Sequence, residues 1–130
     1  MALPTSGEIG PVVAWMGAHQ GHTVDSSHSY ATAQCDDSKT LFVSGHLYQT
    51  NLPNQQFHVY FKLDGNAPVS TPSTFTTGGD GTGDFAFSVE GMASGTHAVA
   101  VEINHVTDNL TYYMDASTAS GGKGIPFTCP

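Results

Sequence analysis

The sequence contains no arginine and three lysines among 130 residues, against eleven acidic residues, for a formal net charge of −8. A protein that binds DNA or RNA neutralises backbone phosphates with several lysine and arginine side chains. Anionic membrane surfaces attract the same basic residues. The charge therefore argues against nucleic acids and membranes as partners, and it favours solubility through self-repulsion.

Long apolar runs are also missing. Since no stretch of eighteen apolar residues occurs, the sequence predicts no membrane-spanning helix. The longest apolar stretch near the start, residues 11–16, is too short for the core of a secretory signal, and no basic residue precedes it. Two explanations stay open: the protein is made without a signal, or a signal has been removed and Met1 is not the native start.

Familiar catalytic motifs do not occur. The sequence holds no Gly-x-Ser-x-Gly elbow, no His-Glu-x-x-His motif and no phosphate-binding loop with a lysine. Sugar hydrolysis needs two carboxylates in one cleft, and we expect Glu90 and Glu102 to face outward from strands. The sequence therefore predicts a protein that is not an enzyme and that uses no cofactor.

The seven histidines provide weak candidates for a metal site. His19, His22 and His28 could together offer imidazole ligands to zinc, copper or nickel. Their spacing in a polar segment is unspecific, so solvated loop residues are the favoured interpretation and we expect no bound metal. His46 and His58 are expected on neighbouring strands, where they could meet on one outer face.

An acidic pair, Asp80 and Asp84, brackets the segment Gly81-Thr82-Gly83. Calcium needs several oxygen ligands that converge on one loop, and this segment is too poor in them. We therefore expect a turn in which aspartate and glycine provide special backbone angles.

The two cysteines, Cys35 and Cys129, belong to no Cys-x-x-Cys motif and show no zinc spacing. One disulfide between them would close a long loop and stabilise the fold. Two reduced thiols are the default for a cytosolic protein. The sequence leaves both alternatives open.

Alternating apolar residues are the strongest structural signal, and they are clearest over residues 82–103. Apolar side chains at every second position predict half-buried strands over 85–89 and 99–103, joined by residues 91–95 with glycine at both ends. We expect an antiparallel hairpin with one apolar face, which a second layer must cover.

Further strands are predicted over 12–16, 30–35, 40–48, 56–63 and 110–115, with a short edge strand around Phe75. Pro68 and Pro72 argue against a central strand between residues 67 and 79. Short strands at turn spacing predict an all-β sandwich. Its expected core comprises Leu41, Val43, Phe57, Val59, Phe61, Phe85, Phe87, Val89, Val99, Val101 and Ile103.

Two segments carry a resemblance to known families. The turn Asp-Gly-Thr-Gly at 80–83, the strand Phe-x-Phe-x-Val at 85–89 and the segment Ala-Ser-Gly-Thr-His-x-Val-x-Val at 93–101 resemble bacterial and phage immunoglobulin-like domains. The opening Met-Ala-Leu-Pro-Thr-Ser-Gly resembles small tailed-phage virion proteins. The resemblance implies an immunoglobulin-like antiparallel Greek-key β-sandwich, a fold that serves spacers, adhesins and virion decorations alike.

The chain is expected to divide into three parts. Residues 1–11 form an extended N-terminal arm, residues 12–115 the sandwich and residues 116–130 a Ser/Gly-rich C-terminal arm. Both arms are too polar and too rich in proline or glycine to fold alone, so we expect them to dock on neighbouring subunits.

Aromatic residues on the outer faces are the expected partner-binding residues. An exposed apolar patch can bind a protein or a sugar, but an arm of the same chain can also cover it, and both interpretations stay open. The candidates are Leu3, Trp15, Phe42, Tyr48, Tyr60 and Tyr113.

Two functions remain. The first is a structural accessory protein on the surface of a phage virion, either a capsid decoration or a tail protein. It would be oligomeric in the assembly, with the major capsid or tail protein as its partner. The second is a secreted, extracellular adhesin or carbohydrate-binding module, for which a surface glycan is the partner.

Overall fold

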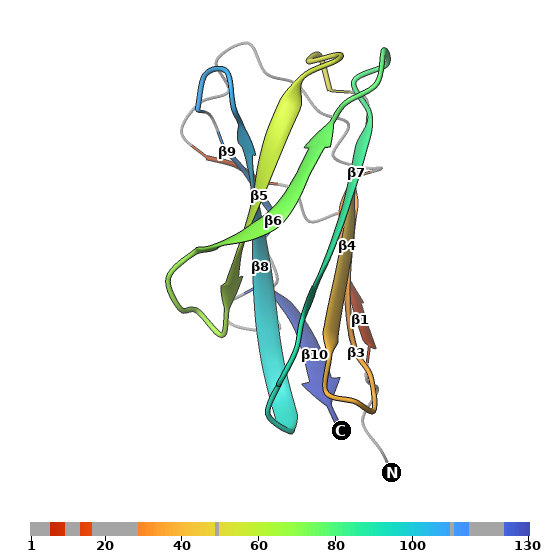
Figure 1. Ribbon diagram of the computed structural model, residues 1–130, viewed down its shortest axis with the longest axis vertical. Helices are drawn as coiled ribbons and strands as arrows, with labels where there is room; N and C mark the ends of the chain where they lie inside the picture. Colours follow the sequence, from red (N-terminus) through yellow and green to blue (C-terminus); the bar gives the residue numbers. More distant parts are fainter. Residues whose placement is uncertain (1–5, 10–13, 17–28, 49, 110, 115–123) are drawn as a thin grey trace.

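The computed structural model describes residues 6–9, 14–16, 29–48, 50–109, 111–114 and 124–130. These residues form strands, turns and loops without a helix, so none of them belongs to a helix able to cross a membrane. The strands build two antiparallel sheets that face each other as a sandwich (Figure 1). The predicted all-β sandwich is confirmed, and its strand order is compatible with an immunoglobulin-like Greek key.

Four strands form the first sheet, sheet A. Their order is β1 (Ser6–Ile9), β3 (Tyr30–Cys35), β4 (Leu41–Leu47) and β7 (Gly83–Val89). Burial alternates along its strands, so one face packs on the core while the other meets solvent.

Six strands form the second sheet, sheet B. Five of them follow the order β2 (Ala14–Met16), β9 (Thr111–Met114), β8 (Gly95–His105), β5 (Gln56–Leu63) and β6 (Val69–Thr76). The sixth strand, β10 (Ile125–Cys129), pairs with the first half of β8, whereas β9 pairs with its second half. β5 occupies the other edge of β8. The strands β9 and β10 therefore lie one after the other along the same edge of β8.

The expected hairpin over residues 82–103 is wrong. β7 pairs with β4 in sheet A, whereas β8 pairs with β5 in sheet B, so the connection through residues 90–94 crosses from one sheet to the other. Period-two alternation shows which side of a strand is buried but not which strand lies beside it. The apolar faces of β7 and β8 lie in opposite sheets and face the same core. Each of the two strands is thus part of the layer that covers the other.

Both predicted arms contain strands. Residues 6–9 pair with β3, and residues 125–129 pair with β8. In β10, Ile125, Phe127 and Cys129 are buried while Pro126 and Thr128 are half-buried. This short alternation follows directly on a Ser/Gly-rich segment, whose composition concealed the strand.

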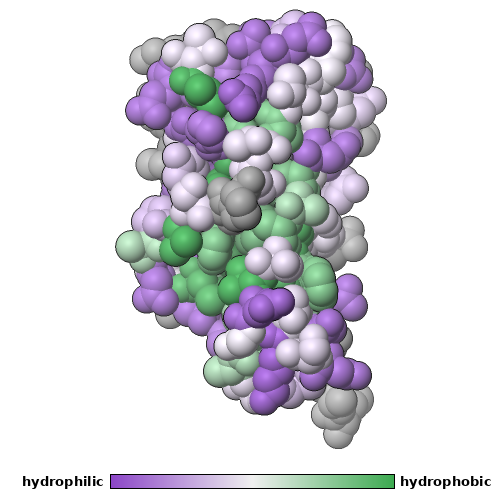
Figure 2. Space-filling view, viewed as in Figure 1, coloured by the Kyte–Doolittle hydropathy of each residue, from purple (hydrophilic) through white to green (hydrophobic). Residues whose placement is uncertain are grey.

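The core contains most of the residues that the alternation predicts, but Phe87 and Val89 are only partly buried. β6 is an edge strand, which suits the proline within it, Pro72, although at eight residues it is longer than the short strand expected around Phe75. The hydroxyl of Ser73 in β6 donates a hydrogen bond to the carbonyl of Ala86 in β7, 3.3 Å away. Toward its start β6 diverges from β7 (Figure 1), and Figure 2 shows that apolar side chains reach the surface along the middle of this edge.

Candidate functional site

Several predicted site residues cannot be placed as side chains. Leu3, His19, His22 and His28 lie outside the described residues. Two further candidates, Trp15 in β2 and Tyr113 in β9, are described at the backbone alone.

The other predicted aromatic residues do not all lie on one surface. Phe42 and Tyr48 belong to β4 of sheet A or follow it directly, whereas Tyr60 lies on the outer face of sheet B beside Glu102. The expected meeting of His46 and His58 is wrong for the same reason, because β4 and β5 are in different sheets. Outer faces of two opposed layers point in opposite directions.

The outer faces of the two sheets differ in exposure. On sheet B, the outward residues Ala98, Ala100 and Glu102 of the central strand β8 are all buried. Glu102 forms an ion pair with Lys62, 3.1 Å away. On sheet A the outward positions of β4 and β7 are mostly exposed, so this sheet presents the open face.

We call this surface the outer face of sheet A. Its central strand β4 runs between β3 on one side and β7 on the other, and Ser44 lies opposite Ala86 in the register. Two shallow depressions follow β4, and they share Ser44 and Ala86. The face comprises the outward residues Tyr30, Thr32, Gln34, Phe42, Ser44, His46, Asp84, Ala86 and Ser88.

An aromatic row marks one end of this face. The His46 ring lies between Tyr30 and Tyr48, with ring centroids 5.5 and 5.7 Å away and planes tilted by 32° and 31°. On β7, Asp84 contacts the Nδ1 atom of His46 through a carboxylate oxygen. The contact ties the middle ring of the row to the neighbouring strand.

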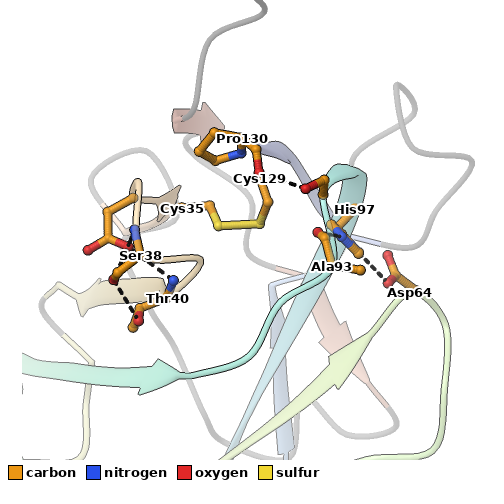
Figure 3. The surroundings of a disulfide bond; sticks show 10 residues. Cys35, Ser38, Thr40, Asp64, Ala93, His97, Cys129 and Pro130 are labelled. Atoms are coloured by element: carbon orange, nitrogen blue, oxygen red, sulfur yellow. Dashed lines mark hydrogen bonds and ion pairs between the residues drawn. A yellow bond between two sulfur atoms is a disulfide. The ribbon is translucent and has the colours of Figure 1, made fainter.

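The disulfide lies at the opposite end of sheet A. Cys35 at the end of β3 is bonded to Cys129 at the end of β10, and their Cα atoms are 5.1 Å apart (Figure 3). Both cysteines are buried. Of the two alternatives that the sequence leaves open, the structure has the bridge, which joins sheet A to sheet B across 94 residues of sequence.

A turn follows Cys35. The Asp36 carboxylate accepts hydrogen bonds from the Ser38 hydroxyl and amide and from the Thr40 amide, at 2.7, 3.0 and 3.0 Å. These bonds, the Ser38 hydroxyl above all, lower the pKa of Asp36. Asp80 likewise forms a turn, since its carboxylate accepts the Thr82 amide at 2.9 Å, which lowers its pKa.

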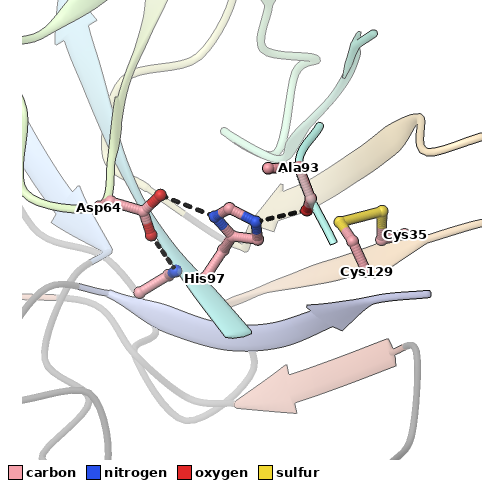
Figure 4. Close-up of polar contacts among 6 residues, drawn as sticks. Cys35, Asp64, Ala93, His97 and Cys129 are labelled. Atoms are coloured by element: carbon pink, nitrogen blue, oxygen red, sulfur yellow. Dashed lines mark hydrogen bonds and ion pairs between the residues drawn. A yellow bond between two sulfur atoms is a disulfide. The ribbon is translucent and has the colours of Figure 1, made fainter. Parts of the chain in front are cut away.

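His97 near the disulfide is held by two acceptors (Figure 4). Its Nε2 atom lies 2.7 Å from the Ala93 carbonyl, and its Nδ1 atom lies 2.7 Å from the Asp64 carboxylate. Neither acceptor can donate while Asp64 is ionised, so both contacts are satisfied as hydrogen bonds when both ring nitrogens carry protons and the ring is positively charged. The bond to Asp64 accordingly raises the pKa of His97, against the opposing effect of burial.

This ion pair connects three parts of the sandwich. Asp64 follows β5, and its second carboxylate oxygen accepts the amide of Ala98 in β8 at 2.9 Å. Ala93 belongs to the connection between the sheets, and the His97 ring stacks on Phe127 of β10 at 5.6 Å. His97 therefore acts as a structural clamp, since its ring nitrogens are both occupied by the protein.

A third histidine, His105, is buried at the far end of β8, with Nδ1 2.8 Å from Asp108. Although three histidines thus contact aspartates, the described part of the chain places no group of three or more His, Cys, Asp or Glu side chains to hold a metal ion. Sequence reasoning missed the pairs His46–Asp84 and His97–Asp64, whose members are 38 and 33 residues apart. No motif marks such pairs, because strand pairing and turns bring them together.

Comparisons with family models, curated proteins and solved structures find no match to this chain.

Proposed function

We propose that this protein is a non-enzymatic accessory protein on the surface of a phage virion, a capsid decoration or tail protein, which docks on neighbouring subunits through the open edge between β6 and β7. The phage-like opening of the sequence supports the location. The apolar surface at this edge is the observation that supports docking there.

The apolar edge consists of Phe61, Leu63, Val69, Phe87 and Val89. Val69 is 50% exposed, and Leu63, Phe87 and Val89 are half-buried. Phe61 and Phe87 come from opposite sheets and stack with ring centroids 5.1 Å apart. The edge thus presents side chains of the core itself, and contiguous apolar surface of this kind is typical of a protein interface.

Two further features favour a different protein as the partner. β7 is the last strand of sheet A, so an extended segment can add to it through main-chain hydrogen bonds. Glu90 follows β7 and Asp84 lies within it, and the chain carries a net charge of −8. This acidity opposes pairing with a second copy and favours a partner segment with basic residues beside its apolar ones.

The test uses particles sedimented from the source culture. We expect the protein to sediment with them and purified protein to rebind to particles stripped of it. Val69→Asp should abolish rebinding, because it places a carboxylate in the apolar edge. Thr74→Asp adds the same charge to an exposed position of β6 and should rebind normally. A protein found in the particle-free supernatant alone, or equal rebinding of both variants, would contradict the proposal.

A secreted adhesin or carbohydrate-binding module is the second candidate, and the disulfide is the observation that supports it. Structural disulfides persist mainly outside the reducing cytosol. A virion surface after release is also oxidising, so the bridge fits both locations. Fractionation of the culture decides between them, since a secreted module remains soluble in the medium without particles.

A further inference from the structure

We propose that the outer face of sheet A is a binding site for a neutral oligosaccharide, with the rings of Tyr30 and Phe42 as its stacking surfaces. The apolar edge borders this face along β7, but the two stacking rings, on β3 and β4, do not belong to that edge. The site is therefore independent of particle docking and applies to either location of the protein.

The first argument is the placement of exposed aromatic side chains. Phe42 is 49% exposed and Tyr30 is 41% exposed, and both belong to this face. A single exposed aromatic residue is ordinary. Here the two residues mark opposite ends of one surface, because Tyr30 lies opposite His46, four residues from Phe42 on β4. The distance along the strand is roughly 13 Å, at about 3.3 Å for each residue.

The second argument is the shape of the surface between these ends. Ser44 and Ala86 lie opposite each other in the register and line both depressions. Their small side chains leave a shallow trough along β4. A trough with an aromatic ring at each end fits an extended ligand better than a compact one.

The third argument is the chemistry of the trough. A pyranose ring has apolar C–H faces, which stack on aromatic rings, and a rim of hydroxyl groups, which need hydrogen-bonding partners. The trough offers both kinds of group. The hydroxyls of Thr32 and Ser44 lie 2.9 Å apart, and the Gln34 amide is exposed beside them. Hydroxyl and amide groups both donate and accept, as sugar hydroxyls do.

The fourth argument is charge. Among the outward residues of β3, β4 and β7 that define this face there is no lysine, and the carboxylate among them is that of Asp84, whose side chain is 75% exposed. Sialylated, sulfated and uronic glycans carry negative charge and would need a cation there. The face therefore suits neutral sugars.

The His46–Asp84 contact has an orienting part in this site. Asp84 contacts one nitrogen of the His46 ring, which itself packs against Tyr30 and Tyr48. The His46 ring, held by Asp84, restricts the ring of Tyr30, and a restricted ring loses less conformational entropy when a sugar stacks on it. Asp84→Asn should weaken binding less than the loss of a stacking ring.

The experiment begins with the full-length, disulfide-intact protein on an array of neutral, sialylated and sulfated glycans. We expect binding to neutral oligosaccharides, which titration calorimetry with the same glycan then quantifies. Tyr30→Ala and Phe42→Ala should each weaken binding at least about tenfold, the loss typical of a hot-spot residue. Both residues are exposed, so the variants should fold, and their thermal unfolding confirms it.

Val69→Ala is the matched control, since it truncates an equally exposed apolar residue at the apolar edge and should leave glycan binding unchanged. Binding to no glycan, or to charged glycans alone, would overturn the inference. It also fails if Tyr30→Ala and Phe42→Ala bind as the wild type does. Val69→Asp separates this inference from the proposed function, because it should abolish docking to particles and preserve glycan binding.

Discussion

At the scale of single residues, a glycine in β4 leaves room on the core side of sheet A for an aromatic ring from β7. The Phe85 ring lies over Gly45, its partner in the β4–β7 register. A Cβ atom at Gly45 would lie 2.0 Å from the tip of this ring, which is far inside van der Waals contact. Glycine therefore provides the space that the ring fills, although it usually weakens a strand.

We expect Gly45→Ala to lower the free energy of unfolding by about 1–3 kcal/mol, because the Phe85 ring must leave its position in a packed core. Gly79→Ala is the control, since a Cβ atom there meets nothing within 4 Å. Chemical denaturation of both variants measures the difference. Equal stability of the two would contradict this account of Gly45.

At the scale of elements, His97 contacts three segments. They are the end of β5, the connection between the two sheets, and strand β10. The pKa of His97 in the folded protein lies above the ordinary value of about 6.5, so the ring binds its proton more tightly when folded. The contribution of this ion pair to stability is therefore complete at pH values below the pKa that His97 has in the unfolded chain. This contribution is lost as the pH rises through the pKa that His97 has in the folded protein.

The prediction concerns His97→Gln. We expect this variant to lose more stability, relative to the wild type, at about pH 5.5 than at about pH 8.5. His58→Gln changes a half-buried histidine on the outer face of sheet B and serves as the control. Thermal unfolding at both pH values tests the prediction, and a deficit of His97→Gln that grows as the pH rises would contradict it.

At the scale of the whole molecule, the disulfide joins the two sheets through their ends. Cys35 and Cys129 are 94 residues apart in the sequence, so the bridge constrains most of the unfolded chain. A loop of this length corresponds to about 4–5 kcal/mol in the chain-entropy model. The bridge also fastens β10, which is the last strand of the chain, to β3.

We expect reduction of the wild-type protein to lower its denaturant midpoint markedly. A Cys35→Ser/Cys129→Ser double variant should have a low midpoint already, and a reductant should not change it. Mass spectrometry of the untreated protein should show a mass two hydrogens below that of the reduced chain. Two thiols that react freely with an alkylating reagent in the native protein would exclude the bridge.

The sequence by itself determined the class of fold and much of the core. Period-two alternation in 56–63 and 85–89 identifies strands and their buried sides, because a pleated strand points successive side chains to opposite faces. Pro72 within β6 and Pro68 just before it argue for the edge position that β6 has, since proline cannot donate to a strand ladder. These are local properties, which each segment carries in its own residues.

The tertiary structure alone decided which strands are neighbours and which side chains share a surface. It separates β7 from β8, places Tyr60 and Phe42 in different sheets, and brings Asp64 to His97 and Asp84 to His46. It also incorporates residues 125–129 into sheet B, where the sequence suggested an arm. The physical reason is that alternation fixes only the buried side of a strand, whereas pairing partners are selected by packing across the complete sandwich.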